Sequence, residues 1–444
     1  MPYEGEFASG ESLPDLLASK SVVDFQGTIS VKDANEKHPL PASVNGARSP
    51  DHINRVIAID GSVVSAPVRN GYPGAEAALL RIAAVVLDLD KIRNPDPRRI
   101  PRPSEIREME QCDALDAVLP GRNVTERDHP NDSPRRFFRR TIFRALSGPI
   151  EAGHESLLDT LTAITSDRTG GEIACPVEDC SKRVTPSPVF CRCPCARKEG
   201  IYPTDALRLH ERFDETGSNG QVFTLAQQVT EHLALVNILR YCEKAGNPDF
   251  IRDTAFIMDG PLALFGMSAW LHEWIGREVR RIHTRYVDAN HPGVLLVGVE
   301  KTGQFLEHLK QLDWSELDGP GTAIPNGTAL APSKDYTHQH IVNRPAEAKD
   351  FGSQTYYGRK VLYKNRNGQH SVVTTPIVNP SGEDKNCIDR HAFPRLGETL
   401  NILDDLATYL YEDGFAPLVR AHAHAAIPLK AGTEILHRLF SKDG

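Results

Sequence analysis

The feature that most constrains the fold is a short apolar run, Val56–Ile59, followed directly by Asp60-Gly61-Ser62. Four consecutive apolar residues, three of them β-branched, predict a strand that is buried on both faces. We expect the strand to stop at Asp60, because Gly61 can adopt the positive φ of an abrupt turn. The pattern returns at Phe256-Ile257-Met258-Asp259-Gly260. Two such strands can bring two carboxylates to one place, since α/β folds commonly place their chemistry at strand ends.

The composition is that of a soluble globular protein. The chain has 444 residues, of which 40% are hydrophobic and 25% charged. No stretch approaches the roughly 18 consecutive apolar residues of a membrane span. Because Met1–Ser12 is acidic and lacks the layout of a signal peptide, we expect a cytoplasmic protein. The formal net charge of −8 argues against a uniformly basic nucleic-acid coat but leaves room for a local basic groove.

The distribution of apolar segments predicts an interrupted α/β domain. Residues 1–54 are polar and form an N-terminal extension, whereas 55–95 and 221–444 form the core domain. Residues 96–220 differ in composition and are interpreted as an insertion. Outside the two Asp-Gly strands, we predict a strand in the second half of the apolar stretch 77–89, a buried strand over 293–301, and helices over 225–241, 262–282 and 403–411. A hairpin with strands 357–363 and 371–377 is predicted around Asn367-Gly368.

Asp60 and Asp259 are the first candidates for a functional site. A single Asp-Gly step is most often only a turn. Two carboxylates placed together repel each other unless a cation separates them, and hard divalent cations prefer oxygen ligands. Two metal ions about 4 Å apart can activate water and stabilise the leaving oxygen in phosphodiester hydrolysis. The pair therefore indicates either two turns or a metal-dependent hydrolase.

A third carboxylate, Glu231, lies in the helix predicted just before the Asp259 strand. It precedes Leu235 by four residues and Ile238 by seven, so it shares the core-facing side of that helix. A carboxylate there is costly to bury unless it is paired or bound to a metal. The alternative is that Glu231 lies at the border of the apolar stripe and reaches solvent. Asp88 and Asp90 form a rival acidic pair at a strand end.

Taken in order, these features resemble the NurA nuclease family, partners of HerA-type DNA translocases. The resemblance covers about 55–95 and 221–444 and leaves 96–220 outside. Its motifs are Ile57-Ala58-Ile59-Asp60-Gly61-Ser62, the helix carrying Glu231, Ile257-Met258-Asp259-Gly260-Pro261-Leu262, Val297-Gly298-Val299-Glu300-Lys301-Thr302, and Gly414-Phe415-Ala416-Pro417-Leu418-Val419-Arg420-Ala421-His422.

The resemblance implies an RNase H-like fold, a mixed α/β sheet flanked by helices, here with an inserted subdomain. It implies that Asp60, Glu231 and Asp259 bind Mn²⁺ or Mg²⁺, and that His422 occupies the family's histidine position. It also implies a homodimer that acts on DNA ends together with a hexameric HerA-like ATPase, in DNA repair or in defence against invading DNA. The sequence holds no Gly-x₄-Gly-Lys-Ser/Thr motif, so ATP-driven motion is expected from that partner.

The C-terminal motif departs from the family pattern. The family usually has a Tyr-Pro just before the Pro-Leu step, where this chain has Gly414-Phe415-Ala416. Tyr409 or Tyr411 is a candidate replacement in space. A neutral imidazole at His422 can bind a metal or position water, with His424 as the nearby competitor and a surface helix as the alternative. Lys301 either neutralises the scissile phosphate or is a solvated residue after a strand.

Five of the eight cysteines lie between positions 175 and 195. In a reducing compartment such a cluster indicates a metal site rather than disulfides. Zinc takes four thiolate or imidazole ligands in a tetrahedron, so this spacing predicts a structural Zn²⁺ site in the insertion. Five residues are candidates for four places: Cys175, Cys180, Cys191, Cys193 and Cys195.

A basic segment in the insertion combines Arg135, Arg136, Arg139 and Arg140 with aromatic residues such as Phe138. Arginines on phosphates with aromatic rings on bases are typical of single-strand channels. A helix with its Phe face in the core and its Arg face in water has the same pattern.

Two functions follow from the whole sequence: a metal-dependent DNA nuclease, or an inactive zinc-stabilised DNA-binding adaptor that kept the fold.

Overall fold

The computed structural model describes residues 13–29, 38–44, 53–68, 72–89, 110–150, 153–168, 172–177, 179–185, 190–315, 319–342, 345, 349–378, 392–408, 414–427 and 435. The chain divides into a short unit, Met1–Leu40, and a large unit, Pro41–Gly444. The short unit holds α1 (Leu13–Leu17) and α2 (Lys20–Thr28), neither of which buries a residue. Within the described part of the chain, no helix combines the length and apolar character needed to cross a membrane.

The large unit is built on a nine-stranded mixed sheet. Its strand order is β1-β13-β14-β15-β10-β9-β2-β3-β4. The bounds of the strands are β1 (Ala42–Ser43), β2 (Arg55–Pro67), β3 (Glu76–Asp88), β4 (Glu110–Pro120), β9 (Thr254–Asp259), β10 (Leu295–Glu300), β13 (Thr328–Ala331), β14 (Gly358–Lys364) and β15 (His370–Pro376).

Five of these strands set the fold class. β2, β3 and β4 form an antiparallel meander, and β9 and β10 then continue the sheet parallel to β2. A three-stranded meander extended by two parallel strands on the side of the first strand is the arrangement of an RNase H-like sheet. The predicted fold class is therefore confirmed.

Alternating residues of β2 enter two different cores, as the two-residue repeat of a strand requires. Ile57 and Ile59 pack with α5 (Pro134–Ser147), α6 (Leu157–Ile164), α7 (Gly220–Lys244) and α9 (Leu271–Asp288). Val56 and Ala58 pack with α12 (Leu396–Leu406) and with α13 (Ala416–Ala425). Helices thus cover both faces of β2, which explains its unbroken apolar run.

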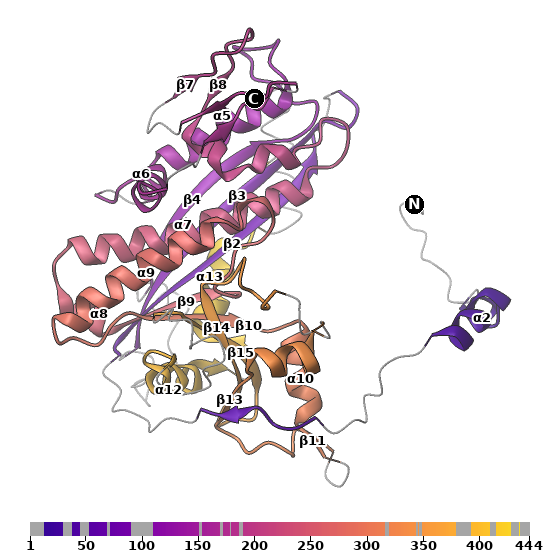
Figure 1. Cartoon of the computed structure of the whole chain (residues 1–444), viewed down its shortest axis with the longest axis vertical. Helices are drawn as coiled ribbons and strands as arrows, with labels where there is room; N and C mark the ends of the chain where they lie inside the picture. The colour runs from indigo at the N-terminus through magenta and orange to yellow at the C-terminus, as the bar shows by residue number, and fades with distance from the viewer. Residues whose placement is uncertain are drawn as a thin grey trace. The chain divides into compact units, whose positions relative to one another are not determined.

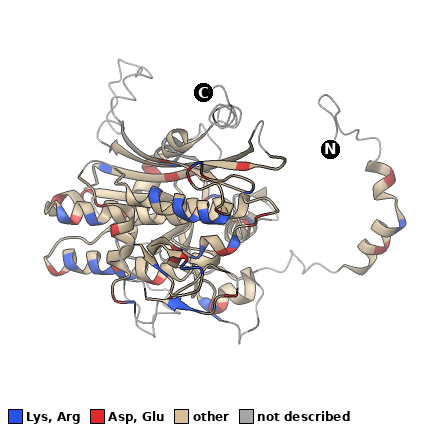
Figure 2. Ribbon diagram, turned by 90° about the horizontal axis from the view of Figure 1, so that it is seen from above, with Lys and Arg blue, Asp and Glu red and all other residues tan. Residues whose placement is uncertain are grey.

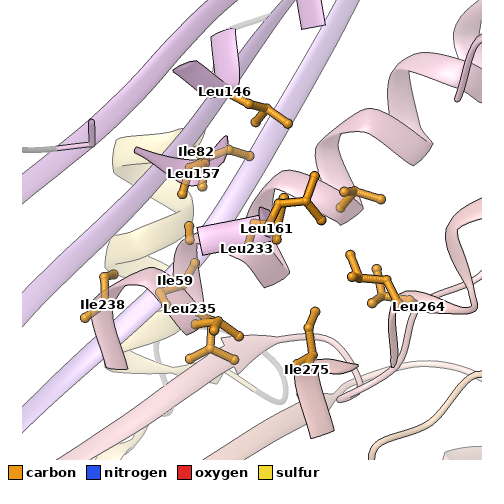
Figure 3. Packing of buried hydrophobic residues seen from close by; sticks show 14 of the residues in the cluster. Ile59, Ile82, Leu146, Leu157, Leu161, Leu233, Leu235, Ile238, Leu264 and Ile275 are labelled. Carbon is orange, nitrogen blue, oxygen red and sulfur yellow. The ribbon is translucent and has the colours of Figure 1, made fainter. Parts of the chain in front are cut away.

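The face covered by α7 carries the larger core. Figure 1 shows α7 running along β2 and β3 with α9 beside it. Figure 3 shows Ile59 of β2 and Ile82 of β3 among the helix residues Leu157, Leu233 and Leu235 of the same cluster. Because α7 packs between the sheet and α9, it is buried on nearly every side.

The prediction that the first strand stops at Asp60 is wrong. β2 continues to Pro67, because β3 pairs with it along its whole length from Arg55 to Pro67. Gly61 therefore makes no turn. Close packing, and not a turn, excludes a side chain at this position: a Cβ on Gly61 would lie 2.3 Å from Glu231 Oε1 and 2.7 Å from Ile82 Cδ1. The second copy behaves as predicted, since β9 ends at Asp259 and Gly260 has a φ of +115°.

Several other predicted elements are confirmed or shifted. β14 and β15 form the predicted hairpin, and Asn365 Oδ1 closes its turn by accepting from the Asn367 and Gln369 amides at 2.9 and 2.8 Å. The helix predicted over 262–282 begins only at Leu271, because Leu264 before it is tied in extended conformation to the Thr355 carbonyl. The helix predicted over 403–411 is shifted toward the N-terminus: α12 ends at Leu406, and Ala407–Thr408 form β16, which pairs with β17 (Gly414–Phe415). Residues 409–413 lie outside the described residues.

The predicted domain boundaries need correction in two places. β4 lies at 110–120 and is an edge strand of the main sheet, so the insertion does not begin at 96. β1, at 42–43, pairs with β13, so the sheet also includes part of the predicted N-terminal extension. In addition, α5 and α6 belong to the main hydrophobic core. What remains as an insertion is the segment with two short hairpins, β5 (Ile173–Ala174) with β6 (Arg183–Val184) and β7 (Cys191–Arg192) with β8 (Gly200–Ile201).

The tight approach of α7 to β2 predicts that Gly61 tolerates no side chain. In Gly61→Ala the methyl group meets Glu231 and Ile82, both of which are enclosed, so we expect the free energy of unfolding to fall by about 1–3 kcal/mol. Urea denaturation measures this change. The matched control is Gly148→Ala, whose new Cβ meets nothing within 4 Å and whose φ of −85° is ordinary. Equal effects of the two substitutions would contradict the packing argument.

Candidate carboxylate site and cysteine cluster

Asp60 and Asp259 lie at neighbouring positions of two adjacent parallel strands. The β2–β9 register pairs Ile59 with Met258, which places the two aspartates at the next step along both strands. Burial is the main cause that raises the pKa of Asp60, and repulsion from the Asp259 carboxylate raises it further. Asp60 is only 8% exposed. The structure thus brings the two predicted aspartates together.

Glu231 reaches the same place from α7 on the other side of β2. It is 9% exposed, and its carboxylate approaches β2 where Gly61 has no side chain. The Gly61 amide donates to Asp60 Oδ1 at 2.8 Å, and a Cβ at Gly61 would lie 2.3 Å from Glu231 Oε1. Asp60 and Glu231 therefore both lie against the backbone of Gly61. Of the two sequence interpretations of Glu231, the core-facing one is confirmed.

The electrostatic state of Glu231 reflects this position. Burial above all, together with the charges of Asp60 and Asp259, raises its pKa to about 8 against the lowering effect of the Gln227 hydrogen bond. Buried carboxylates that raise one another's pKa are the arrangement that a bound cation stabilises. The donor set consists only of carboxylate oxygens, which fits Mg²⁺ or Mn²⁺ better than a soft metal.

Each of the three acids also has a protein partner. His422 Nδ1 lies 2.9 Å from Asp60 Oδ2, and the His422 side chain is 65% exposed on α13. Lys301, just after β10, donates to Asp259 Oδ2 at 3.1 Å. Gln227 Nε2 donates to Glu231 Oε1 at 2.8 Å and to the Gly61 carbonyl at 2.9 Å. The structure thus places two further predicted site residues, His422 and Lys301, at the aspartates.

The carboxylates do not form a closed metal cage. Among the described residues, the cysteine cluster is the only group of three or more possible ligands whose donor atoms all lie within 4.8 Å of one another. Each acid is instead hydrogen-bonded or paired to its own partner. An open set of few carboxylates is nevertheless how Mg²⁺ is usually bound, because it keeps waters and takes substrate phosphates as further ligands.

Sequence reasoning missed Gln227 and the true role of Gly61. Gln227 precedes Glu231 by four residues, so the helical repeat places both on one face of α7. That spacing could have identified Gln227 as the residue that orients Glu231. The rival aspartate Asp90 and the candidate tyrosines Tyr409 and Tyr411 lie outside the described residues.

Four of the five candidate cysteines lie together in the structure. Cys175, Cys180, Cys193 and Cys195 have their sulfur atoms within 4.8 Å of one another, whereas Cys191 is not a member. Cys175 and Cys193 are buried, and all of these cysteines are free thiols. Four clustered thiols are compatible with a structural metal site of the zinc type.

The arginines of α5 contact carboxylates of the chain itself. Arg139 is 3% exposed and donates to Asp205 Oδ1 at 2.9 Å and to Glu199 Oε1 at 2.8 Å. A DNA contact by Arg139 is therefore wrong, because its guanidinium is buried and used inside the protein. Ion pairs also bind Arg136 to Glu199 and Arg140 to Asp132. The DNA contacts of Arg135, Arg136 and Arg140 stay predictions.

The surface of the large unit carries mixed charge. Figure 2 shows basic and acidic residues distributed over several helices. On α9, for example, Arg281 and Arg285 are paired with Glu243 of α7 at 2.6 and 2.7 Å. Ion pairs therefore link the neighbouring helices α7 and α9.

Comparison with known proteins gives likeness in structure alone. No family model matches the chain, and no curated protein matches it. Among solved structures, the chain is similar to the NurA nuclease from Sulfolobus solfataricus, with 8% sequence identity and a TM-score of 0.36. The alignment covers 97% of this chain and 96% of that one.

The raised pKa of Glu231 predicts an unusual pH dependence of stability in the metal-free protein. The carboxyl titrates near 4.5 when unfolded and at about 8 when folded, so the folded protein binds the proton more tightly between these pH values. The free energy of unfolding should therefore fall as the pH rises from about 4.5 to about 8. The raised pKa of Asp60 acts in the same direction.

Glu231→Gln tests this prediction. In EDTA at pH 8 we expect the variant to be more stable than the wild type by at least about 1.4 kcal/mol, the equivalent of one pKa unit. The difference should shrink toward pH 5, as followed by urea denaturation. The control is Glu273→Gln, a glutamate 63% exposed on α9, which should keep the wild-type pH dependence. A Glu231→Gln variant that is less stable at pH 8 would exclude a protonated, buried Glu231.

Proposed function

We propose that this protein is a divalent-metal-dependent deoxyribonuclease that hydrolyses phosphodiester bonds. The observation that carries the proposal is the meeting of three carboxylates at one step of the sheet. Asp60 and Asp259 follow paired positions of β2 and β9, and the Glu231 carboxylate lies against Gly61, the residue after Asp60. Such acids on neighbouring strands, with one more from a helix, suit hard cations and phosphate chemistry.

Each residue of the site has a role in this proposal. Asp60, Glu231 and Asp259 would hold Mg²⁺ or Mn²⁺. When bound, such ions polarise the scissile phosphate and lower the pKa of the attacking water. Gln227 fixes the Glu231 carboxylate through its 2.8 Å hydrogen bond, and His422 fixes Asp60 from the exposed side. Lys301 lies on Asp259, where its ammonium group would contact an incoming phosphate.

The finer features of the proposal rest on the resemblance of the sequence motifs to the NurA family. We propose exonuclease action, single-strand endonuclease action, or both, on DNA in the cytoplasm. We further propose a homodimer that receives DNA from a HerA-like hexameric ATPase, in DNA end processing or in defence against phage DNA. The competing function is that of a catalytically inactive, zinc-stabilised DNA-binding adaptor.

The carboxylate site predicts a loss of nuclease activity in Asp60→Asn and Asp259→Asn. Each substitution removes a charge that the proposed metal needs, so we expect activity to fall by more than about 100-fold, beyond the 10–100-fold typical of residues that only support a ligand. Cleavage of linear double-stranded and single-stranded DNA with Mn²⁺ or Mg²⁺ measures this effect. The control is Asp249→Asn, a residue 60% exposed on α8 (Pro248–Arg252), which should retain wild-type activity.

The same assay separates the two functions. A wild-type protein that binds DNA in gel-shift experiments but does not cleave it, with or without a translocase partner, would favour the adaptor. Cleavage that persists in both aspartate variants would show that the activity resides elsewhere in the chain. Each of these results contradicts the nuclease site proposed for Asp60, Glu231 and Asp259.

The contact between His422 and Asp60 predicts a difference between two histidines of α13. His422→Gln loses the imidazole that holds Asp60, so we expect a 10–100-fold fall in activity, about the effect of removing the group that orients a metal ligand. His424→Gln, two residues further on, should change the activity little. The concentration of Mn²⁺ that gives half-maximal activity should rise only in His422→Gln. Equal behaviour of the two variants would rule out a positioning role for His422.

A further inference from the structure

The four clustered cysteines come from the tips of two small hairpins. The hairpin of β5 and β6 carries Cys175 and Cys180, and the hairpin of β7 and β8 carries Cys193 and Cys195. Each tip is held by backbone hydrogen bonds: the Cys175 amide donates to the Lys182 carbonyl at 3.0 Å, and the Cys193 amide donates to the Glu199 carbonyl at 2.8 Å. Two hairpins that each present two thiols form the frame of a zinc ribbon.

The spacing of the sulfur atoms matches a tetrahedral zinc site. A Zn–S bond of about 2.3 Å places the four sulfurs of a tetrahedron about 3.8 Å apart. The Sγ atoms of Cys180 and Cys193 lie 4.0 Å apart, and all four sulfurs lie within 4.8 Å of one another. A disulfide would instead need a distance of about 2.05 Å.

The hairpins bury few apolar side chains of their own. Among the described residues, their hydrophobic cluster has four buried members, Ile173, Cys175, Cys193 and Ile201, and two of these are thiols of the site. So small a core cannot supply the free energy to fold a segment of this length, and small folds of this kind generally need a metal or disulfides.

We propose that Cys175, Cys180, Cys193 and Cys195 bind one Zn²⁺ ion and that Cys191 is not a ligand. Four thiolates complete the tetrahedron and leave no open position, so the ion is structural and takes no part in cleavage. Cys191 lies in β7, where it pairs with Ile201 of β8, outside the group of four sulfurs.

The position of the site shows what the ion stabilises. Glu199 closes the second cysteine tip through its carbonyl, and its carboxylate accepts from Arg139 of α5 at 2.8 Å. Asp205, which follows β8, accepts from Arg139 at 2.9 Å. The zinc-bound tip therefore presents the acid that anchors the hairpins to α5, and α5 packs in the main core. The inferred ion fixes the insertion to the sheet.

The first experiment measures metal and thiols in the full-length wild-type protein. We expect about one Zn²⁺ per chain by elemental analysis, since four ligands complete one site. Replacing it with Co²⁺ should give the intense sulfur-to-cobalt absorption of a tetrathiolate. Neither measurement depends on DNA cleavage, so this inference and the nuclease proposal can fail separately. A zinc-free protein whose clustered cysteines are all oxidised, or whose Co²⁺ spectrum lacks thiolate bands, would overturn the proposal.

The second experiment compares two cysteines that are two residues apart. Cys193→Ser should lose the bound zinc, and trypsin should then cut first within 172–201, which holds Lys182, Arg183, Arg192, Arg197 and Lys198. Cys191→Ser should keep about one Zn²⁺ per chain and the wild-type digestion pattern. Loss of zinc from Cys191→Ser together with its retention in Cys193→Ser would overturn the assigned ligand set. If Cys193→Ser does not fold, the Co²⁺ spectrum of Cys191→Ser still decides whether four thiolates remain.

Discussion

The close approach of α7 to β2 at Gly61 is the contact on which the site depends. A strand in the middle of a sheet normally separates the side chains of its two faces. Asp60 contacts α13 on one side of β2, whereas Glu231 comes from α7 on the other side. The missing side chain at Gly61 lets the Glu231 carboxylate reach the strand next to Asp60. Without that gap the third acid would remain on the far side of the sheet.

The grouping of these acids opposes folding and favours ligand binding at the same time. Burial and mutual repulsion raise the pKa values of Asp60 and Glu231, which means that their charged forms are unfavourable in the metal-free protein. Gln227, His422 and Lys301 each offset part of this cost with one hydrogen bond or ion pair. A bound cation would remove most of the remaining electrostatic cost of holding the charged carboxylates together. The extensive core around α7 stabilises the fold against this cost.

The inserted hairpins are stabilised in a different way, by buried ion pairs and clustered thiols in place of apolar burial. Arg139 is almost completely buried and links α5 to Glu199 and Asp205. A buried arginine is tolerated only where carboxylates and carbonyls satisfy its donors. The pattern of arginines and phenylalanines in α5 suggested either DNA binding or a solvated face, and neither accounts for Arg139. Its partners lie sixty or more residues further along the chain, so no local pattern could reveal them.

The sequence by itself determined the strands that carry Asp60 and Asp259, the mixed α/β class, the Asn365–Gln369 hairpin turn and the clustering of the cysteines. These follow from apolar runs, glycine steps and ligand spacing, which are local properties. Only the tertiary structure decided that β2 continues past Asp60, that β4 belongs to the main sheet, that Gln227 orients Glu231 and that Cys191 lies outside the group of four sulfurs. The physical reason is that strand pairing, close helix packing and ligand selection depend on contacts between residues far apart in the chain.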